Sequence, residues 1–285
     1  MPVESQSWFE EILEIANGRT FKIKINKIID TFDSEFQRIE IYETKSFGRM
    51  LVIDGVVMCT EWDEYAYHEM IAHVPMCVHP NPESVLVIGG GDGGTMREVL
   101  KHPSVKRVDI CEIDREVINF AIKYLPTMSC SFSDPRVTVY NEDGAKFVRE
   151  HKNTYDIILV DSSDPIGPAV VLFTEEFYAD MRGALKDDGI AATQAESFFY
   201  HADIIEKLVG FAKKLYAHAG YYYTMVPTYP SGVIGFTFCS KKYHPLNDFN
   251  EARVKALGSQ LKYYNADAHR GAFFLPTFIK KRLES

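Results

Sequence analysis

Several features that would assign this chain to a particular class are absent. No apolar run approaches the roughly 20 residues of a membrane span, and the first residues, MPVESQSWFEE, are polar and acidic, unlike a signal peptide. The five cysteines are odd in number and form no CxxC pair, which favours reduced, mostly buried thiols. Repeats and low-complexity tracts are also lacking. We therefore expect a compact, soluble protein of the cytoplasm.

Positive charge is in short supply. The 31 Lys and Arg residues are outnumbered by 40 Asp and Glu residues, so the net charge is −9. Such a balance repels nucleic-acid phosphates and anionic membranes and mildly attracts cationic small molecules, although a solvated acidic surface is the commoner explanation. We expect neither a nucleic-acid nor a membrane partner. With 285 residues, 46% of them hydrophobic, the chain suffices for one large domain or a medium domain with a small companion.

The first part of the chain has the period of β-strands. Apolar and polar residues alternate at 21–25, 38–42, 50–53 and 56–59, and Asp54-Gly55 separates the last two runs. An Asp-Gly pair between apolar runs is typical of a hairpin. We expect a small antiparallel β-domain at residues 1–62.

From residue 63 onward, strands and helices are expected to alternate. A helix at 64–72, ended by the proline-rich link 78–82, leads into strands at 84–88, 107–111, 137–140, 155–160 and 189–194, separated by helices at 95–102, 115–124, 144–151, 174–185 and 202–215. This order predicts a doubly wound, Rossmann-like α/β domain at residues 63–285. The segments 221–226 and 233–239 are expected to add an antiparallel hairpin at the sheet edge.

A glycine loop follows the first of these strands: Gly89, Gly90, Gly91, Asp92, Gly93 and Gly94. Glycines allow a tight turn and close approach of the backbone to a ligand. The loop satisfies GxGxxG, which is weak evidence alone because many dinucleotide enzymes share it. Asp92 stands where a pyrophosphate site would avoid negative charge, which argues against an NAD-dependent dehydrogenase. The loop favours a nucleoside that carries positive charge.

Acidic residues follow the next two strands. Glu112 lies 18 residues beyond Gly94, where an acidic side chain accepts hydrogen bonds from ribose hydroxyls. Asp143 is placed to accept from the exocyclic amine of adenine. The alternatives are a surface glutamate and an aspartate that only caps the helix at 144–151.

The strand at 155–160 leads into the strongest signal, DSSDPIGP at residues 161–168. Asp161 and Asp164, beside Asp92, would form a strongly acidic pocket at the carboxyl edge of the sheet. Crowded carboxylates raise each other's pKa unless cations compensate them. A diamine or a sulfonium would do so. A divalent metal is the rival explanation, disfavoured because no phosphate-binding motif accompanies it.

Six motifs together carry a family resemblance. They are LVIDGVV at 51–57, DEYAYHEM at 63–70, GGGDGG at 89–94, CEID at 111–114, DSSDPIGP at 161–168 and PTYPSG at 227–232. In this order and spacing, over essentially the whole chain, they resemble the polyamine aminopropyltransferase family of spermidine synthases. The resemblance implies decarboxylated S-adenosylmethionine as co-substrate, putrescine as acceptor, no other cofactor, no metal, and a homodimer or homotetramer.

The resemblance also implies roles for individual residues. On the donor it places Gln37 at the adenosyl group, His68 and Asp92 at the aminopropyl end, Glu112 at the ribose, Asp143 and Gly144 at the adenine edge, and Pro168 at the adenine face. Asp161 resembles the general base, and Asp164, Tyr67 and Tyr229 line the polyamine pocket. Gln194, which ends the fifth strand, adds a polar contact.

Other hypotheses stay open at this point. The nucleotide half has the layout of S-adenosylmethionine methyltransferases, so a putrescine N-methyltransferase is the nearest rival, although its donor carboxylate would face Asp92 unfavourably. A polyamine-binding protein without activity is a second. The acceptor could also be cadaverine, agmatine or spermidine, read by the β-domain and the 194–203 loop. Trp8 and Phe9 either close the amine channel or pack in the core, and residues 165–173 form either a gate or a packed surface loop.

Overall fold

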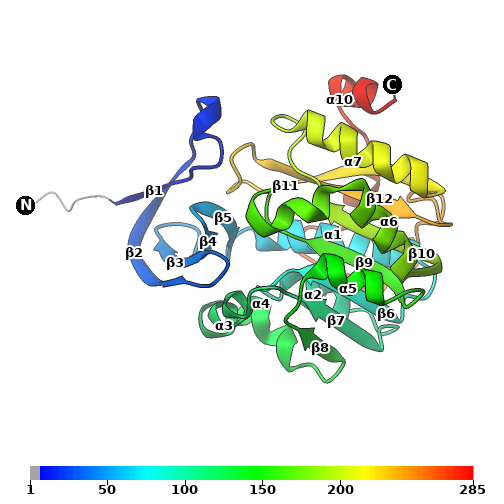
Figure 1. The fold of residues 1–285 in the computed structure, drawn as a ribbon, viewed down its shortest axis with the longest axis horizontal. Helices are drawn as coiled ribbons and strands as arrows, with labels where there is room; N and C mark the ends of the chain where they lie inside the picture. Colours follow the sequence, from blue (N-terminus) through cyan, green and yellow to red (C-terminus); the bar gives the residue numbers. More distant parts are fainter. Residues whose placement is uncertain (1–6, 285) are drawn as a thin grey trace, which may run out of the picture.

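The computed structural model describes residues 7–284 and contains a small sheet set against the end of a larger α/β body (Figure 1). Residues 1–6 of the expected N-terminal domain lie outside the described residues. The small sheet is antiparallel, in the order β1-β2-β3-β4-β5. Its strands are β1 (Trp8–Glu10), β2 (Lys22–Asp33), β3 (Arg38–Thr44), β4 (Arg49–Ile53) and β5 (Val56–Thr60).

Local sequence explains most of the small sheet. Asp54 and Gly55 have φ values of 50° and 79° and join β4 to β5, which confirms the predicted hairpin. The short strand β1 was not predicted. Within it, the Phe9 ring lies 5.3 Å from that of Tyr42, whereas Trp8 is 54% exposed. Phe9 is therefore a core residue, and neither Trp8 nor Phe9 lines the cavity described below.

The larger sheet has seven strands in the order β11-β12-β10-β9-β6-β7-β8. The five strands from β10 to β8 are parallel, and the β11–β12 hairpin joins β10 antiparallel at one edge. The predicted doubly wound sheet and its edge hairpin are confirmed. The strands are β6 (Ser84–Gly89), β7 (Arg107–Cys111), β8 (Val137–Tyr140), β9 (Tyr155–Asp161), β10 (Leu185–Gln194), β11 (His218–Met225) and β12 (Val233–Ser240).

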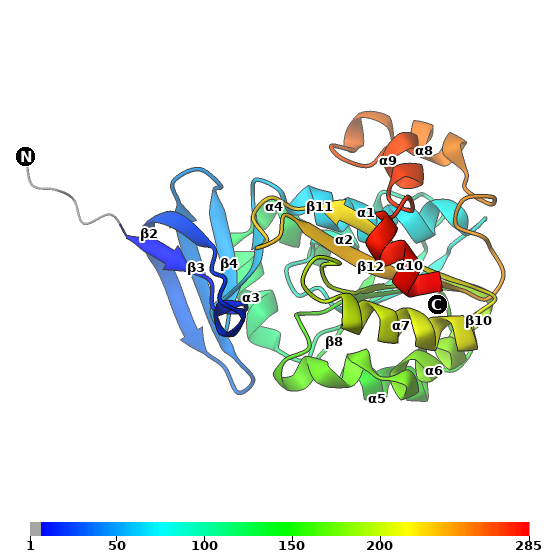
Figure 2. The ribbon, with the colours of Figure 1, turned by 90° about the horizontal axis from the view of Figure 1, so that it is seen from above.

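Helices cover both faces of this sheet (Figure 2). One face carries α1 (Glu64–Val78), α2 (Gly94–Leu100), α8 (Glu251–Leu257) and α9 (Ala266–Gly271), and the other carries α5 (Gly144–Glu150), α6 (Glu175–Ala184), α7 (Ala202–Leu215) and α10 (Thr277–Glu284). The helices α3 (Arg115–Tyr124) and α4 (Pro126–Ser129) pack on the small sheet. Short 3-10 helices are η1 (Ile15–Asn17), η2 (Cys130–Ser133), η3 (Gly167–Phe173) and η4 (Gly258–Gln260). Within residues 7–284, no helix combines the length and apolar character of a membrane span.

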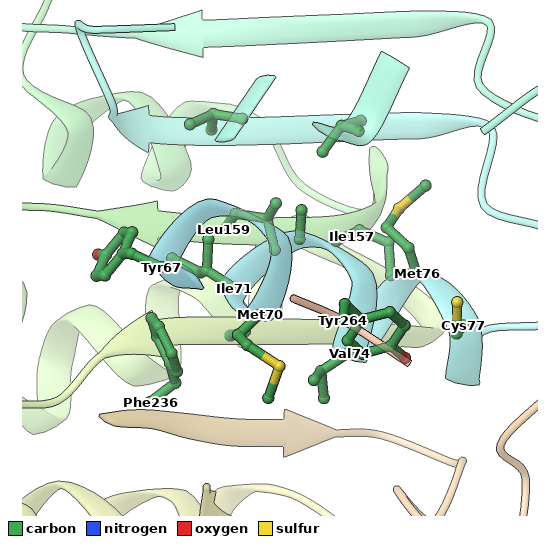
Figure 3. Close-up of a cluster of buried hydrophobic side chains, with 14 of the residues drawn as sticks. Tyr67, Met70, Ile71, Val74, Met76, Cys77, Ile157, Leu159, Phe236 and Tyr264 are labelled. Carbon is green, nitrogen blue, oxygen red and sulfur yellow. The ribbon is translucent and has the colours of Figure 1, made fainter. Parts of the chain in front are cut away.

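The helix α1 is longer than predicted. It continues past Ala72 to Val78 and holds Pro75 in its interior, although proline removes a helical hydrogen bond. Nearly all of its side chains are buried, among them Ile71 and Val74, which belong to the same core cluster as Ile157 of β9 (Figure 3). Tertiary packing on both sides outweighs the local cost of the proline.

The order of strands creates a crevice. From β6 the chain proceeds to β7 and β8 and then returns to β9 on the other side of β6. Ligands of open α/β sheets bind at such a switch point, outside the carboxyl ends of the strands. The backbone N–H of Gly90 donates to the carbonyl of Asp161 over 2.8 Å here. A Cβ at Gly89 would lie 2.2 Å from that carbonyl oxygen, so this close approach requires glycine.

Candidate active site

A cavity of about 530 Å³ occupies this crevice, between the two sheets. The small sheet contributes wall residues such as Leu51 and Val57, and the large sheet contributes the ends of β6 and β9. Gly93 and Gly94 are not part of the wall; Gly93 is the N-cap residue of α2 and Gly94 its first residue. The other predicted site residues all line it: Gln37, Tyr67, His68, Gly89, Gly90, Gly91, Asp92, Glu112, Asp143, Gly144, Asp161, Asp164, Pro168, Gln194 and Tyr229.

Asp92 and His68 are partners inside the cavity. Asp92 accepts a hydrogen bond from the Gly94 N–H at 2.7 Å, and its other oxygen lies 3.3 Å from His68 Nε2. His68 Nδ1 lies 2.6 Å from Glu64, which also accepts from Arg97. With one carboxylate hydrogen-bonded at Nδ1 and a second close to Nε2, the surroundings favour the ring with both nitrogens protonated. Burial opposes this charge, but Asp92 and Glu64 hold the pKa of His68 well above its ordinary value.

The charge of His68 keeps Asp92 ionised. Burial opposes ionisation of Asp92, yet the neighbouring imidazolium and the Gly94 N–H leave its pKa below the ordinary value. The neighbours Glu64 and Arg97 were not identified from the sequence. Glu64 is the residue after Asp63, the N-cap of α1. Its partner Arg97 lies 33 residues further along the chain, so no local sequence pattern indicates the pair.

Asp161 has the opposite electrostatic environment. Burial, followed by the charge of Asp92, raises the pKa of Asp161 above its ordinary value. The charge of His68, and then hydrogen bonds from Thr95 Oγ1 at 2.6 Å and from Tyr67, oppose that shift. The carboxylate is therefore desolvated, oriented and poised to take up a proton, as a general base requires.

Two tyrosines lie beside Asp161. The rings of Tyr67 and Tyr229 are 6.3 Å apart in an edge-to-face arrangement, and the hydroxyl of Tyr229 donates to the carbonyl of Met58 at 2.7 Å. Tyr67, from α1, is buried, whereas Tyr229, from the loop after β11, is partly buried. Their ring surfaces form an apolar wall next to the carboxylates.

The other end of the cavity is suited to a nucleoside. Burial raises the pKa of Glu112 to about 7, and this carboxyl group accepts from the Asp114 N–H at 3.0 Å. Gln37 donates to the Asp114 side chain at 3.0 Å, which fixes its position across the domain boundary. Asp143 caps α5 by accepting from Ala145 N–H at 2.8 Å. Asp143 therefore caps α5 and also lines the cavity, and its contact with adenine stays a prediction.

A second group of carboxylates lies beyond Asp161. Burial, and then the charge of Glu196, hold the pKa of Asp164 well above its ordinary value. Glu11 is 2% exposed, and burial raises its pKa to about 7. Neither oxygen of Glu11 has a close hydrogen-bond partner among residues 7–284. Glu11 lies in the β-domain and Glu196 in the 194–203 loop, the two regions predicted to contact the acceptor amine. Neither residue was predicted individually as part of the site.

The loop after Asp164 forms part of the same wall. It contains η3, with Ile166 and Val170 exposed and Ala169 buried. Ile166, Pro168 and Leu172 line the cavity. Its role as a gate stays a prediction. No cluster of three or more His, Cys, Asp or Glu residues with metal-binding geometry occurs in the described part of the chain.

Comparisons with known proteins agree with this arrangement. Residues 64–251 match the profile described as spermine/spermidine synthase domain, and residues 7–61 match that of the spermidine synthase tetramerisation domain. The chain is 55% identical over 273 residues to the polyamine aminopropyltransferase of Leptospira biflexa, covering 96% of each protein. It is 44% identical over 280 residues to the spermidine synthase of Dictyostelium discoideum, covering 97% of each. A solved spermidine synthase in complex with the transition state analogue AdoDATO superposes with a TM-score of 0.95 at 43% identity, covering 100% of this chain and 97% of the other.

Proposed function

The chain belongs to the spermine/spermidine synthase family and is an aminopropyltransferase, and from this premise we propose that it transfers the aminopropyl group of decarboxylated S-adenosylmethionine to putrescine. The observation that carries the proposal is the presence of Asp92, Asp161 and Asp164 in one cavity, where cationic substrates stabilise their ionised forms. The products are spermidine and 5′-methylthioadenosine. The donor acts as a co-substrate, and the reaction uses neither a further cofactor nor a metal.

The donor occupies the end of the cavity near β7 and β8. Its ribose hydroxyls donate hydrogen bonds to Glu112. These bonds replace the water that burial excludes, so they favour the ionised form of the Glu112 carboxyl group. Asp143 and Gly144 contact the adenine edge. Pro168 covers the adenine face, and Gln37 contacts the adenosyl group. The ammonium of the donor's tail binds at Asp92, whose charge His68 maintains.

The reaction is a direct displacement at carbon. An alkylamine titrates near the lysine value of about 10.4 and is mostly protonated at neutral pH, so its reacting end must lose a proton. Asp161 accepts that proton, and the freed lone pair attacks the methylene beside the sulfonium. The carbon–sulfur bond breaks, and its electrons stay on sulfur as a neutral thioether. General-base help of this kind contributes about 10²–10⁴-fold.

Alignment of the two substrates contributes a further part of the rate. Holding both in one closed site is worth roughly 7–11 kcal/mol when the reacting atoms are in contact. Tyr67 and Tyr229 confine the methylene chain of the amine, and Asp164 with Gln194 contacts its polar groups. The far ammonium of the diamine binds between Glu11 and Glu196, where it compensates the buried Glu11 and the neighbouring Asp164, both of which are costly to ionise alone.

The proposal is tested with Asp161→Asn. This variant keeps the shape of the side chain but cannot accept the proton, so turnover should fall by about 10²–10⁴-fold while donor binding persists. The measurement is methylthioadenosine release, with donor affinity from calorimetry. Asp187→Asn, at an exposed position of β10, is the matched control. Near wild-type turnover of Asp161→Asn would exclude the assigned role. Release of S-adenosylhomocysteine from ordinary S-adenosylmethionine would instead indicate methyl transfer.

For the assembly, we propose a homotetramer formed through the N-terminal domain, taken as residues 1–62. The match of residues 7–61 to a tetramerisation domain supports this choice over a dimer. The small sheet also exposes large apolar side chains, including Ile28 and Phe32, as association surfaces do. Analytical ultracentrifugation should give four chains per particle, and a dimer across the micromolar range would contradict it.

A further inference from the structure

His201 joins the two domains at the far end of the cavity. Its Nε2 is hydrogen-bonded to Glu14 Oε1 at 2.8 Å, and its Nδ1 lies 2.9 Å from Glu196 Oε2. Glu14 belongs to the N-terminal segment just before η1, whereas Glu196 lies on the loop after β10. Nε2 is hydrogen-bonded to one carboxylate, and Nδ1 lies close to a second without hydrogen-bond geometry. The two carboxylates favour the charged form of the ring, a cation between two anions.

The segment 11–19 is attached on both sides. Toward the small sheet, the Glu11 N–H donates to Phe21 O at 2.9 Å and the Ile12 N–H to Gly55 O at 3.3 Å. Toward the catalytic domain, the Arg19 guanidinium lies 3.9 Å from the centre of the Tyr200 ring and also pairs with Glu14. Segment 11–19 therefore connects the two domains, and His201 contacts it at Glu14.

The contact made by His201 determines the positions of two carboxylates, those of Glu196 and Glu11. Glu196 has a φ of +67°, which is uncommon for a residue with a side chain. Its carbonyl accepts from the Gly235 N–H at 3.0 Å and from the Tyr221 hydroxyl at 2.8 Å, which holds this backbone in place. His201 then fixes the Glu196 carboxylate beside Asp164. On the opposite wall, the segment anchored through Glu14 carries Glu11 into the cavity.

We propose that His201 is a positioning residue that sets the length of the amine the enzyme accepts, an inference that rests on the proposed function. By holding segment 11–14 against the 196–201 loop, its cation closes the cavity at the distance that suits a short diamine. The far ammonium then meets Glu11 and Glu196 in fixed positions. Without the cation, the wall loosens, a short diamine loses its anchors, and a longer triamine gains room.

The contact also responds to pH. Burial disfavours the charged ring, but Glu196 and Glu14 raise the pKa of His201 above its ordinary value. The charge is present below that raised pKa and is lost as the pH climbs through it, so the wall loosens toward alkaline pH. The titratable and charged groups around the ring are Glu11, Glu14, Arg19, Asp164, Glu196 and Tyr200.

The kinetic test compares His201→Gln with His201→Lys, which keeps a positive charge to about pH 10. His218→Gln, on the edge strand β11, is the matched control. In His201→Gln we expect the KM for putrescine to rise about tenfold, the scale of one charge-assisted hydrogen bond. The KM for the donor should stay unchanged, and the preference for putrescine over spermidine should fall. His201→Lys should retain the preference, and its putrescine KM should lack the alkaline rise of the wild type.

Unchanged putrescine KM and amine preference in His201→Gln would overturn the inference. Wild-type NMR titration of the His201 ring provides a check that needs no variant, and a neutral ring at pH 7 would overturn it equally. If the wild type forms no methylthioadenosine with any amine, the proposed function fails by itself. Calorimetric binding of putrescine and spermidine to the wild type and His201→Gln then still decides the role of His201.

Discussion

Gly94→Ala should disable the donor site through a single methyl group. Gly94 begins α2, and a Cβ there would lie 2.3 Å from Nδ1 and Cε1 of His68. The His68 ring has little freedom to move away, because its Nδ1 is hydrogen-bonded to Glu64 at 2.6 Å. The methyl group must therefore displace His68 from Asp92 or move the start of α2.

The change in the free energy of unfolding of Gly94→Ala follows from two opposing contributions. Overpacking of a closed site costs about 1–3 kcal/mol, whereas Ala in place of Gly in a helix gains up to about 1 kcal/mol. Gly210→Ala isolates the second contribution, since Gly210 lies within α7 and its added Cβ would meet nothing within 4 Å. We expect Gly210→Ala to be more stable than the wild type and Gly94→Ala to be less stable.

Displacement of His68 should also weaken donor binding. Without the imidazolium, burial and Asp161 disfavour ionisation of Asp92, so the donor's ammonium loses a charge-assisted partner worth about 1.5–3 kcal/mol, or roughly 10–150-fold in affinity. Urea unfolding midpoints at equal protein concentration and calorimetry with the donor measure the two effects. If Gly94→Ala matches Gly210→Ala in stability and binds the donor like the wild type, the reasoning is refuted.

Three further predictions concern buried polar groups. Thr95→Val removes the 2.6 Å hydrogen bond to Asp161, so the pKa of Asp161 should rise and the acidic limb of kcat/KM should move up by about one pH unit; an unmoved limb would contradict its role. In the ligand-free protein, the contribution of Glu112 to the free energy of unfolding should fall as pH rises from 4.5 to about 7, because unfolding lets this carboxyl group ionise; urea midpoints of Glu112→Gln should lack this component. Tyr155→Phe, which loses a 2.6 Å bond to Asp109, should cost about 1–3 kcal/mol in the same assay, whereas an unchanged midpoint would show that the bond contributes nothing.

Elements with strong local periodicity were predicted well. The strand at 107–111 and the helices at 115–124 and 202–215 match β7, α3 and α7 at both ends. The extension of α1 past Pro75 was missed because its cause is burial between distant elements rather than a local preference. The three C-terminal helices α8 to α10 were likewise not predicted.

For the site, the pattern of strand ends was sufficient to bring the right residues together. Asp92, Glu112 and Asp143 each follow a parallel strand and Asp161 ends one, and the carboxyl ends of such strands meet at one edge. Every residue assigned to substrate lines the cavity, although the individual roles remain proposals. The charge states could not be predicted, because desolvation and distant partners determine them.

The sequence by itself determined the order of elements, the acidic character of the pocket and the family to which the chain belongs, because strand periodicity and the spacing of strand-end residues are local properties. Only the tertiary structure decided that His68 is an imidazolium, that Asp161 resists ionisation, and that His201 meets Glu14 across 187 residues. Such contacts depend on how packed elements meet in space. The spacing of residues along the chain does not predict these contacts. Desolvation and the neighbouring charges then determine which of the buried groups are ionised.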